Sequence, residues 1–124
     1  MLAHSNLVAF AATADAEAAQ DFYQDVLGLP LIEDSPFALV FDAYGTQLRV
    51  QKVDKVVVSG YTILGWQVED IATMARKLKD RGVVFEYFPG LEQNETGIWQ
   101  SPSGAKIAWL KDPAGNVLSL TQYA

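Results

Sequence analysis

The side chains that most often carry out enzyme chemistry are scarce in this sequence. It contains no cysteine, and its one histidine, His4, stands close to the start of the chain. The lack of cysteine excludes disulfides, thiolate nucleophiles, Cys-based zinc sites and iron–sulfur clusters. A single histidine excludes any metal site that needs two imidazoles from one chain, and it argues against a buried Ser-His-Asp triad. We interpret His4 as a solvated N-terminal residue rather than a metal ligand.

The remaining candidates are side chains that bind rather than react. Arg49 could form a bidentate pair with a ligand carboxylate or phosphate, or it could pair with an acidic neighbour or reach solvent. Trp109 could stack on a planar or cationic ligand, whereas Trp99 fits a ligand wall, a lid or a dimer contact equally well. Ser119 has no candidate histidine base, and no Gly-x-Ser-x-Gly sequence is present. The sequence therefore favours a binding site over a nucleophilic one.

Composition narrows the class of protein further. The chain has 124 residues, of which 50% are hydrophobic and 19% charged, as expected for a folded domain with its own core. The net charge of −6 argues against nucleic-acid and anionic-membrane partners and makes a cationic ligand easier to accommodate. No signal-peptide pattern and no apolar run of membrane-spanning length is visible, so we expect a cytoplasmic protein.

The first half of the chain predicts one strand, one helix and three further strands. Leu7–Ala12 is an apolar run of strand length, and Asp15 is a plausible helix N-cap. Apolar residues then recur every three or four positions until Gly28, which is typical of a helix that ends at a glycine. Short strands separated by turn residues follow at Pro30–Glu33, Phe37–Phe41 and Thr46–Lys52.

The second half repeats this order. A strand at Tyr61–Val68 precedes a helix that Asp70 caps and Gly82 closes, and the two cap aspartates lie about 55 residues apart. A strand at Val83–Phe88 follows. After a loop over 89–97 that we interpret as solvated come a short strand at Ile98–Gln100 and a hairpin of Lys106–Leu110 with Val117–Thr121. The prediction is an α+β domain over 1–124 made of two tandem βαβββ modules, 1–53 and 61–124, with a linker at 54–60.

Two segments resemble the vicinal oxygen chelate superfamily, which includes glyoxalase I, bleomycin-resistance proteins and extradiol dioxygenases. Residues 15–28 match its pattern of an Asp, a helix bearing Phe-Tyr, and Leu-Gly, while residues 110–118 match its Asp-Pro-x-Gly-Asn turn before the last strand. The resemblance covers almost the whole chain. It implies the duplicated fold, with a mixed sheet in each module and a cleft.

Enzymes of that superfamily hold a divalent metal with His or Glu from the first and last strands of each module. Carried over by position, the four ligand positions fall on Val8, Arg49, Ile63 and Ser119. Valine and isoleucine have no donor atom, arginine is a permanent cation, and a lone serine hydroxyl is a poor ligand. We therefore expect no metal and no other cofactor.

Strand alternation predicts which side chains line the cleft instead. The expected site is apolar with an aromatic wall and few polar groups, which is the usual composition of a small-molecule pocket. Trp66 falls on the opposite face and is expected in the core. The predicted ligand-binding residues are Val8, Phe10, Arg49, Gln51, Ile63, Gln67, Ile107, Trp109 and Ser119.

Three functions remain open from the sequence. The first is a metal-free protein that binds, and so sequesters, a small aromatic or cationic molecule, as the bleomycin-resistance branch does. The second is a glyoxalase-like lyase or isomerase with altered chemistry that uses Arg49 and a polar partner. The third is a structural or regulatory subunit whose sheet face is filled. The resemblance also implies a homodimer.

Overall fold

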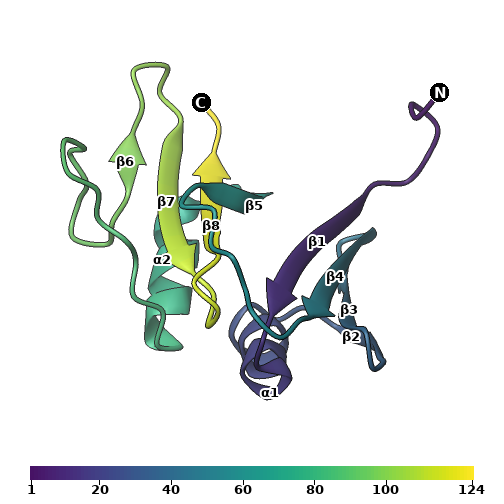
Figure 1. Cartoon of the computed structure of the whole chain (residues 1–124). Helices are drawn as coiled ribbons and strands as arrows, with labels where there is room; N and C mark the ends of the chain where they lie inside the picture. The colour runs from purple at the N-terminus through teal and green to yellow at the C-terminus, as the bar shows by residue number, and fades with distance from the viewer. The chain divides into compact units, whose positions relative to one another are not determined.

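The computed structural model describes residues 1–124 and divides into two compact units, residues 1–58 and 59–124. Each unit consists of a helical segment and a four-stranded mixed sheet, and the order strand, helix, three strands occurs in both (Figure 1). The predicted fold class is therefore confirmed. Neither helical segment is long and apolar enough to span a membrane.

The sheet of the first unit has the order β1-β4-β3-β2. Its strands are β1 (Val8–Thr13), β2 (Leu31–Asp34), β3 (Ala38–Ala43) and β4 (Thr46–Lys52). β1 runs parallel to β4, and the other pairs are antiparallel. Tyr44 and Gly45 connect β3 to β4 with φ angles of 52° and 90°, the conformation of a two-residue hairpin turn. This turn sets the register of β3 against β4.

The helical segment of the first unit is only partly α-helical. Asp15 accepts a hydrogen bond from the amide of Ala18 and starts α1 (Ala16–Gln20), as predicted. A π-helix, η1 (Asp21–Val26), continues it, and Leu27 N donates to Phe22 O five residues back. The expectation of a continuous α-helix is wrong here, because apolar spacing identifies the buried face but not the hydrogen-bond register.

Tyr23 is the centre of the first unit's core. Its side chain is completely buried, and its ring centroid lies 5.6 Å from that of Phe41 on β3. Phe41 is paired in register with Leu48, and this face of the sheet buries Leu39 and Val50 as well. The sheet face that includes Phe10 and Arg49 is the opposite one.

The sheet of the second unit has the strand order β5-β8-β7-β6, which is equivalent to that of the first sheet. Its elements are β5 (Thr62–Gln67), α2 (Ile71–Asp80), β6 (Trp99–Gln100), β7 (Lys106–Lys111) and β8 (Val117–Gln122). Asp70 caps α2, and the hydrogen bonds from the backbone amide and then the hydroxyl of Thr73 hold the pKa of Asp70 below its usual range. α2 buries Ile71, Ala75 and Leu78.

The segment 83–88, predicted as a strand, is not one. Its side chains alternate as in a strand, with Val83 and Phe85 buried and Val84 exposed. However, Gln93 takes the backbone groups that a neighbouring strand would pair: its amide nitrogen donates to Glu86 O and Gly97 O, and its Oε1 accepts from Phe88 N. A side chain thus replaces a strand partner, which a pattern of hydrophobicity cannot reveal.

Replacing Gln93 with leucine is expected to lower the free energy of unfolding by about 2 kcal/mol, because three backbone groups lose their partner. Chemical denaturation measures the loss, and amide hydrogen exchange should localise it to residues 86–97. Gln20→Leu is the matched control, since Gln20 bonds only to Gln24 on an exposed surface. Equal losses in the two variants would contradict the structural role of Gln93.

Candidate functional site

An aromatic group gathers on the face of the second sheet that α2 leaves uncovered. Strand register places Gly65, Ser119 and Trp109 side by side across β5, β8 and β7. The next row along the same face contains Gln67, Thr121, Ile107 and Trp99. The register of four strands therefore brings together the side chains that alternation in the sequence assigns to one face of this sheet. Ile63 is the exception.

Three aromatic rings form what we call the aromatic cluster: Phe88, Trp99 and Trp109. The centroids of Trp99 and Trp109 lie 6.2 Å apart with the rings inclined at 33°, and Phe88 meets Trp109 edge-on at 5.3 Å. Trp99 and Trp109 are partly buried, and Phe88 is 37% exposed. Partly open aromatic faces held in fixed mutual geometry can stack on a planar ligand or attract a cation.

Ser119 is the polar group next to this cluster, and Gly65 makes room for its hydroxyl. Ser119 is only 8% exposed, and a Cβ added at Gly65 would lie 2.8 Å from its Oγ. A glycine in the middle of a strand weakens the strand and often marks a place where another group approaches closely. Here the close group is the Ser119 hydroxyl.

Gly65→Ala is expected to lower the free energy of unfolding by about 1 kcal/mol, because the Ser119 hydroxyl must leave its rotamer. The double variant Gly65→Ala with Ser119→Ala removes the clash and should recover most of this loss. A thermodynamic cycle of the two single variants and the double variant measures the coupling. Additive effects would show that the two residues do not compete for the same space.

The uncovered face of the first unit carries a cation. Arg49 on β4 is flanked in register by Phe10 on β1 and Val40 on β3. Its guanidinium donates to the Gln47 amide oxygen at 3.3 Å and forms no ion pair with a carboxylate. Of the alternatives left open by the sequence, a structural salt bridge is therefore wrong, and the positive charge of Arg49 stays uncompensated.

The other predicted residues occupy varied surroundings. Val8 and Phe10 are 39% and 50% exposed on β1, Gln51 is exposed on β4, and Ile63 is partly buried. Ile63 lies in a register irregularity between Thr62 and Leu64, so simple alternation does not fix its face. His4 is exposed ahead of β1.

Sequence reasoning missed Phe88 as a member of the aromatic cluster. It was assigned to the end of a strand, and only the irregular path of 83–98 brings its ring against Trp109. No local pattern in the sequence signals this contact, because it depends on the hydrogen bonds of Gln93.

The donor set does not fit a divalent metal at the four positions that the resemblance implied. Val8 and Ile63 offer no donor atom, Arg49 is a cation, and Ser119 supplies one hydroxyl. The His, Asp and Glu side chains do not form a group of three or more suited to a metal in the structure.

Comparison with known proteins gives one family and many similar structures. The model of the Glyoxalase/Bleomycin resistance protein/Dioxygenase superfamily matches residues 4–120. No curated protein sequence matches the chain. A glyoxalase/bleomycin resistance protein/dioxygenase from Alicyclobacillus acidocaldarius superposes with a TM-score of 0.74 at 25% identity, over 97% of this chain and 92% of the other.

Two further structures share the fold and belong to proteins with different roles. An antibiotic binding protein from Streptomyces sp. CB03234 has a TM-score of 0.71 at 23% identity, covering 100% of this chain and 99% of that one. Lactoylglutathione lyase from Agrobacterium tumefaciens has a TM-score of 0.71 at 17% identity, covering 95% and 93%. The fold is thus compatible with binding and with catalysis, and it does not choose between them.

Proposed function

Because the chain belongs to the Glyoxalase/Bleomycin resistance protein/Dioxygenase superfamily, we propose that it is a metal-free protein that binds a small planar molecule, preferably a cationic one, on the aromatic cluster. The observation that carries this proposal is the arrangement of Phe88, Trp99 and Trp109 on the uncovered face of the second sheet. Stacking there would supply most of the affinity, and the Ser119 hydroxyl would add an orienting hydrogen bond.

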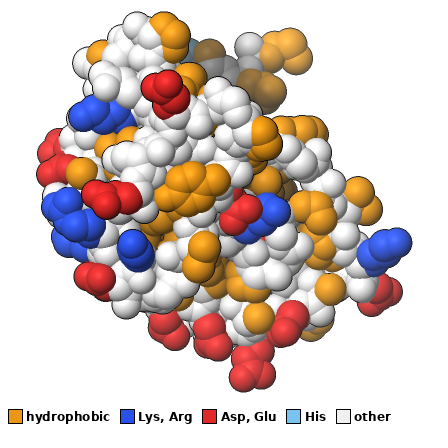
Figure 2. Space-filling model, turned by 90° about the vertical axis from the view of Figure 1, so that its left-hand side faces the viewer, with side chains coloured by type: hydrophobic (Ala, Val, Ile, Leu, Met, Phe, Trp, Pro, Cys, Tyr) orange, Lys and Arg blue, Asp and Glu red, His pale blue; other side chains and the backbone are white.

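The charge of the protein supports the preference for a cation. The chain carries 15 acidic and 9 basic residues, and the face seen in Figure 2 shows acidic side chains among apolar and basic ones. A negative surface raises the local concentration of cations, and tryptophan faces attract them at short range. The two effects act in the same direction for an aromatic cation.

The donor chemistry supports binding rather than metal-assisted isomerisation or ring cleavage. Positions that would need imidazole or carboxylate groups hold Val8, Ile63, Arg49 and Ser119. An activity of this chain would therefore have to use other groups. Stoichiometric metal in the purified protein would overturn this part of the proposal.

Three matched probes test the proposed site by tryptophan fluorescence: 1-naphthylmethylammonium, 1-naphthalenesulfonate and cyclohexylmethylammonium. The first is an aromatic cation, the second an aromatic anion and the third a cation without a π face. We expect the first to bind at least about tenfold more tightly than either of the others. Equal affinity for the saturated amine would contradict stacking, and no quenching by any probe would contradict the site.

We also propose that two copies of the chain associate through the edge strand β1. β1 is a terminal strand of its sheet, and it exposes Val8 and Phe10, whose burial a second copy could supply. Light scattering at micromolar concentration should give the mass of a dimer. Phe10→Lys should shift it to the mass of a monomer, and a monomeric unmodified protein would refute the proposal.

A further inference from the structure

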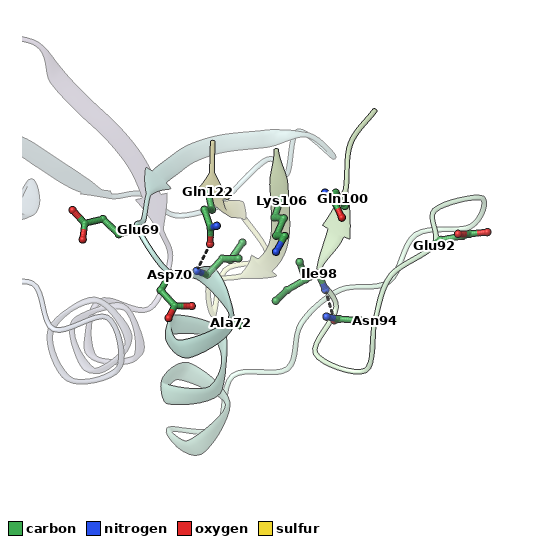
Figure 3. Close-up of a pocket in the computed structure, with 10 residues that line it drawn as sticks. Glu69, Asp70, Ala72, Glu92, Asn94, Ile98, Gln100, Lys106 and Gln122 are labelled. Carbon is green, nitrogen blue, oxygen red and sulfur yellow. Dashed lines mark hydrogen bonds between the residues drawn. The ribbon is translucent and has the colours of Figure 1, made fainter. Parts of the chain in front are cut away.

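A pocket lies on the face of the second sheet opposite the aromatic cluster, between the start of α2 and the segment 92–98 (Figure 3). Its volume is about 550 Å³, within the range of small-molecule sites. Its floor is a row of three polar side chains paired across β6, β7 and β8: Gln100, Lys106 and Gln122. Because side chains alternate along a strand, this row and the aromatic cluster are on opposite faces.

Lys106 is the unusual member of this row. Its side chain is partly buried, lies between Gln122 and Gln100 in Figure 3, and forms no hydrogen bond or ion pair within the chain. The Lys106 ammonium forms no ion pair with a carboxylate of the chain, so it can donate to an anionic oxygen that enters the pocket.

Two amide groups add donors that point in fixed directions. Gln122 Oε1 accepts from the backbone amide of Ile71 at 2.9 Å, so its Nε2 is directed elsewhere and has no partner. Asn94 Oδ1 accepts from Thr96 N, Thr96 Oγ1 and Ile98 N, which leaves its Nδ2 without a partner as well. The pocket therefore presents hydrogen-bond donors whose acceptors are missing from the chain.

The rest of the lining limits what could occupy the pocket. Ala72 is exposed at its wall and Ile98 is 8% exposed there, and these two side chains can contact a hydrocarbon tail. Asp70 already caps α2, while Glu69 and Glu92 extend outward on opposite sides in Figure 3. The lining thus carries three carboxylates and one ammonium, so a multiply charged anion is disfavoured relative to a singly charged one.

We propose that this pocket binds a small aliphatic monocarboxylate. The carboxylate accepts hydrogen bonds from Lys106 and from the side-chain amides of Gln122 and Gln100, and the tail packs against Ala72 and Ile98. This pocket is on the helix-covered face of the sheet, apart from the aromatic cluster.

Four probes of related size test it in ¹H–¹⁵N and methyl NMR titrations: hexanoate, hexanamide, adipate and inorganic phosphate. Hexanoate should shift the side-chain amide signals of Gln122 and Gln100 and the methyl signals of Ala72 and Ile98. The other three should bind at least about tenfold more weakly, because each lacks the single charge or the tail. Equal affinity for hexanamide, or shifts confined to the tryptophan indoles, would overturn the proposal.

Variants separate the pocket from general charge effects. Lys106→Met should abolish saturable hexanoate binding, whereas Lys77→Met, which removes a lysine of α2 outside the pocket, should leave the affinity unchanged. If Lys106→Met fails to fold, Gln100→Ala provides the second variant, since the Gln100 side chain has no partner to lose, and it should weaken binding about threefold. If whichever of these two variants folds binds hexanoate as tightly as the unmodified protein, the proposed site is wrong.

Discussion

Asp112→Ala is expected to destabilise the protein by about 3 kcal/mol or more, because it removes the acceptor for several buried donors. The Asp112 carboxylate accepts from the backbone amides of Ala114 and Asn116 and from Asn116 Nδ2, at 2.8–3.0 Å. Asp112 and Asn116 are 6% and 5% exposed, so water cannot replace the lost bonds. Thermal and chemical unfolding measure the effect.

An exchange of the two side chains tests the physical reason. Asp112→Asn alone should be strongly destabilising, since one of the two accepting oxygens becomes an NH2 group. That group then faces either Asn116 Nδ2 or the backbone amides, which are themselves donors. Adding Asn116→Asp restores a donor and an acceptor with unchanged net charge, and should recover part of the loss. If the double variant is no more stable than Asp112→Asn, the reciprocal bond is not what holds this turn between β7 and β8.

Trp109→Ala is expected to weaken binding of 1-naphthylmethylammonium by about thirtyfold, because central aromatic anchors dominate binding sites of this kind. Trp109 contacts both other rings of the aromatic cluster, so its loss removes one stacking face and loosens Phe88 and Trp99. Isothermal titration gives the affinity without depending on tryptophan emission.

Trp66→Phe is the matched control for this variant. Trp66 is paired in register with Leu120 on the sheet face opposite the cluster, so its replacement should leave the affinity within about twofold of the unmodified protein. Trp109→Phe should retain most of the binding, since it keeps an aromatic face. A similar loss in Trp66→Phe and Trp109→Ala would indicate that stability, not ligand contact, controls the affinity.

The duplicated order of elements could be predicted because it depends on features that act locally. Asp15 and Asp70 cap helices, Gly28 and Gly82 adopt positive φ where those helices end, and β4 has the predicted bounds. Each of these is decided by a side chain within a few residues of its effect. Because the same features recur in the second half of the chain, its order of elements could be predicted from that of the first half.

Side-chain hydrogen bonds to the backbone and an irregular strand pairing account for the parts that the sequence did not predict. The segment 83–88 has the alternation of a strand, yet the Gln93 side chain binds its backbone groups. Ile63 is displaced from simple alternation by the irregular pairing of β5 with β8. Neither feature leaves a trace in the spacing of apolar residues.

The candidate site was likewise predictable only in part. Alternation placed Gly65, Gln67, Ile107, Trp109 and Ser119 on one face, because a strand period of two is robust. Phe88 joined the aromatic cluster only through the path of the irregular segment 83–98.

The most direct test of ligand binding at the aromatic cluster uses the three tryptophans as separate reporters. Their indole Nε1–H signals, followed by ¹H–¹⁵N NMR during a titration with 1-naphthylmethylammonium, distinguish the two faces of one sheet. Binding at the cluster predicts saturable shifts of the Trp99 and Trp109 signals while the Trp66 signal stays in place. Saturable shifts of Trp66 alone, or no saturable shift in any of the three, would contradict it.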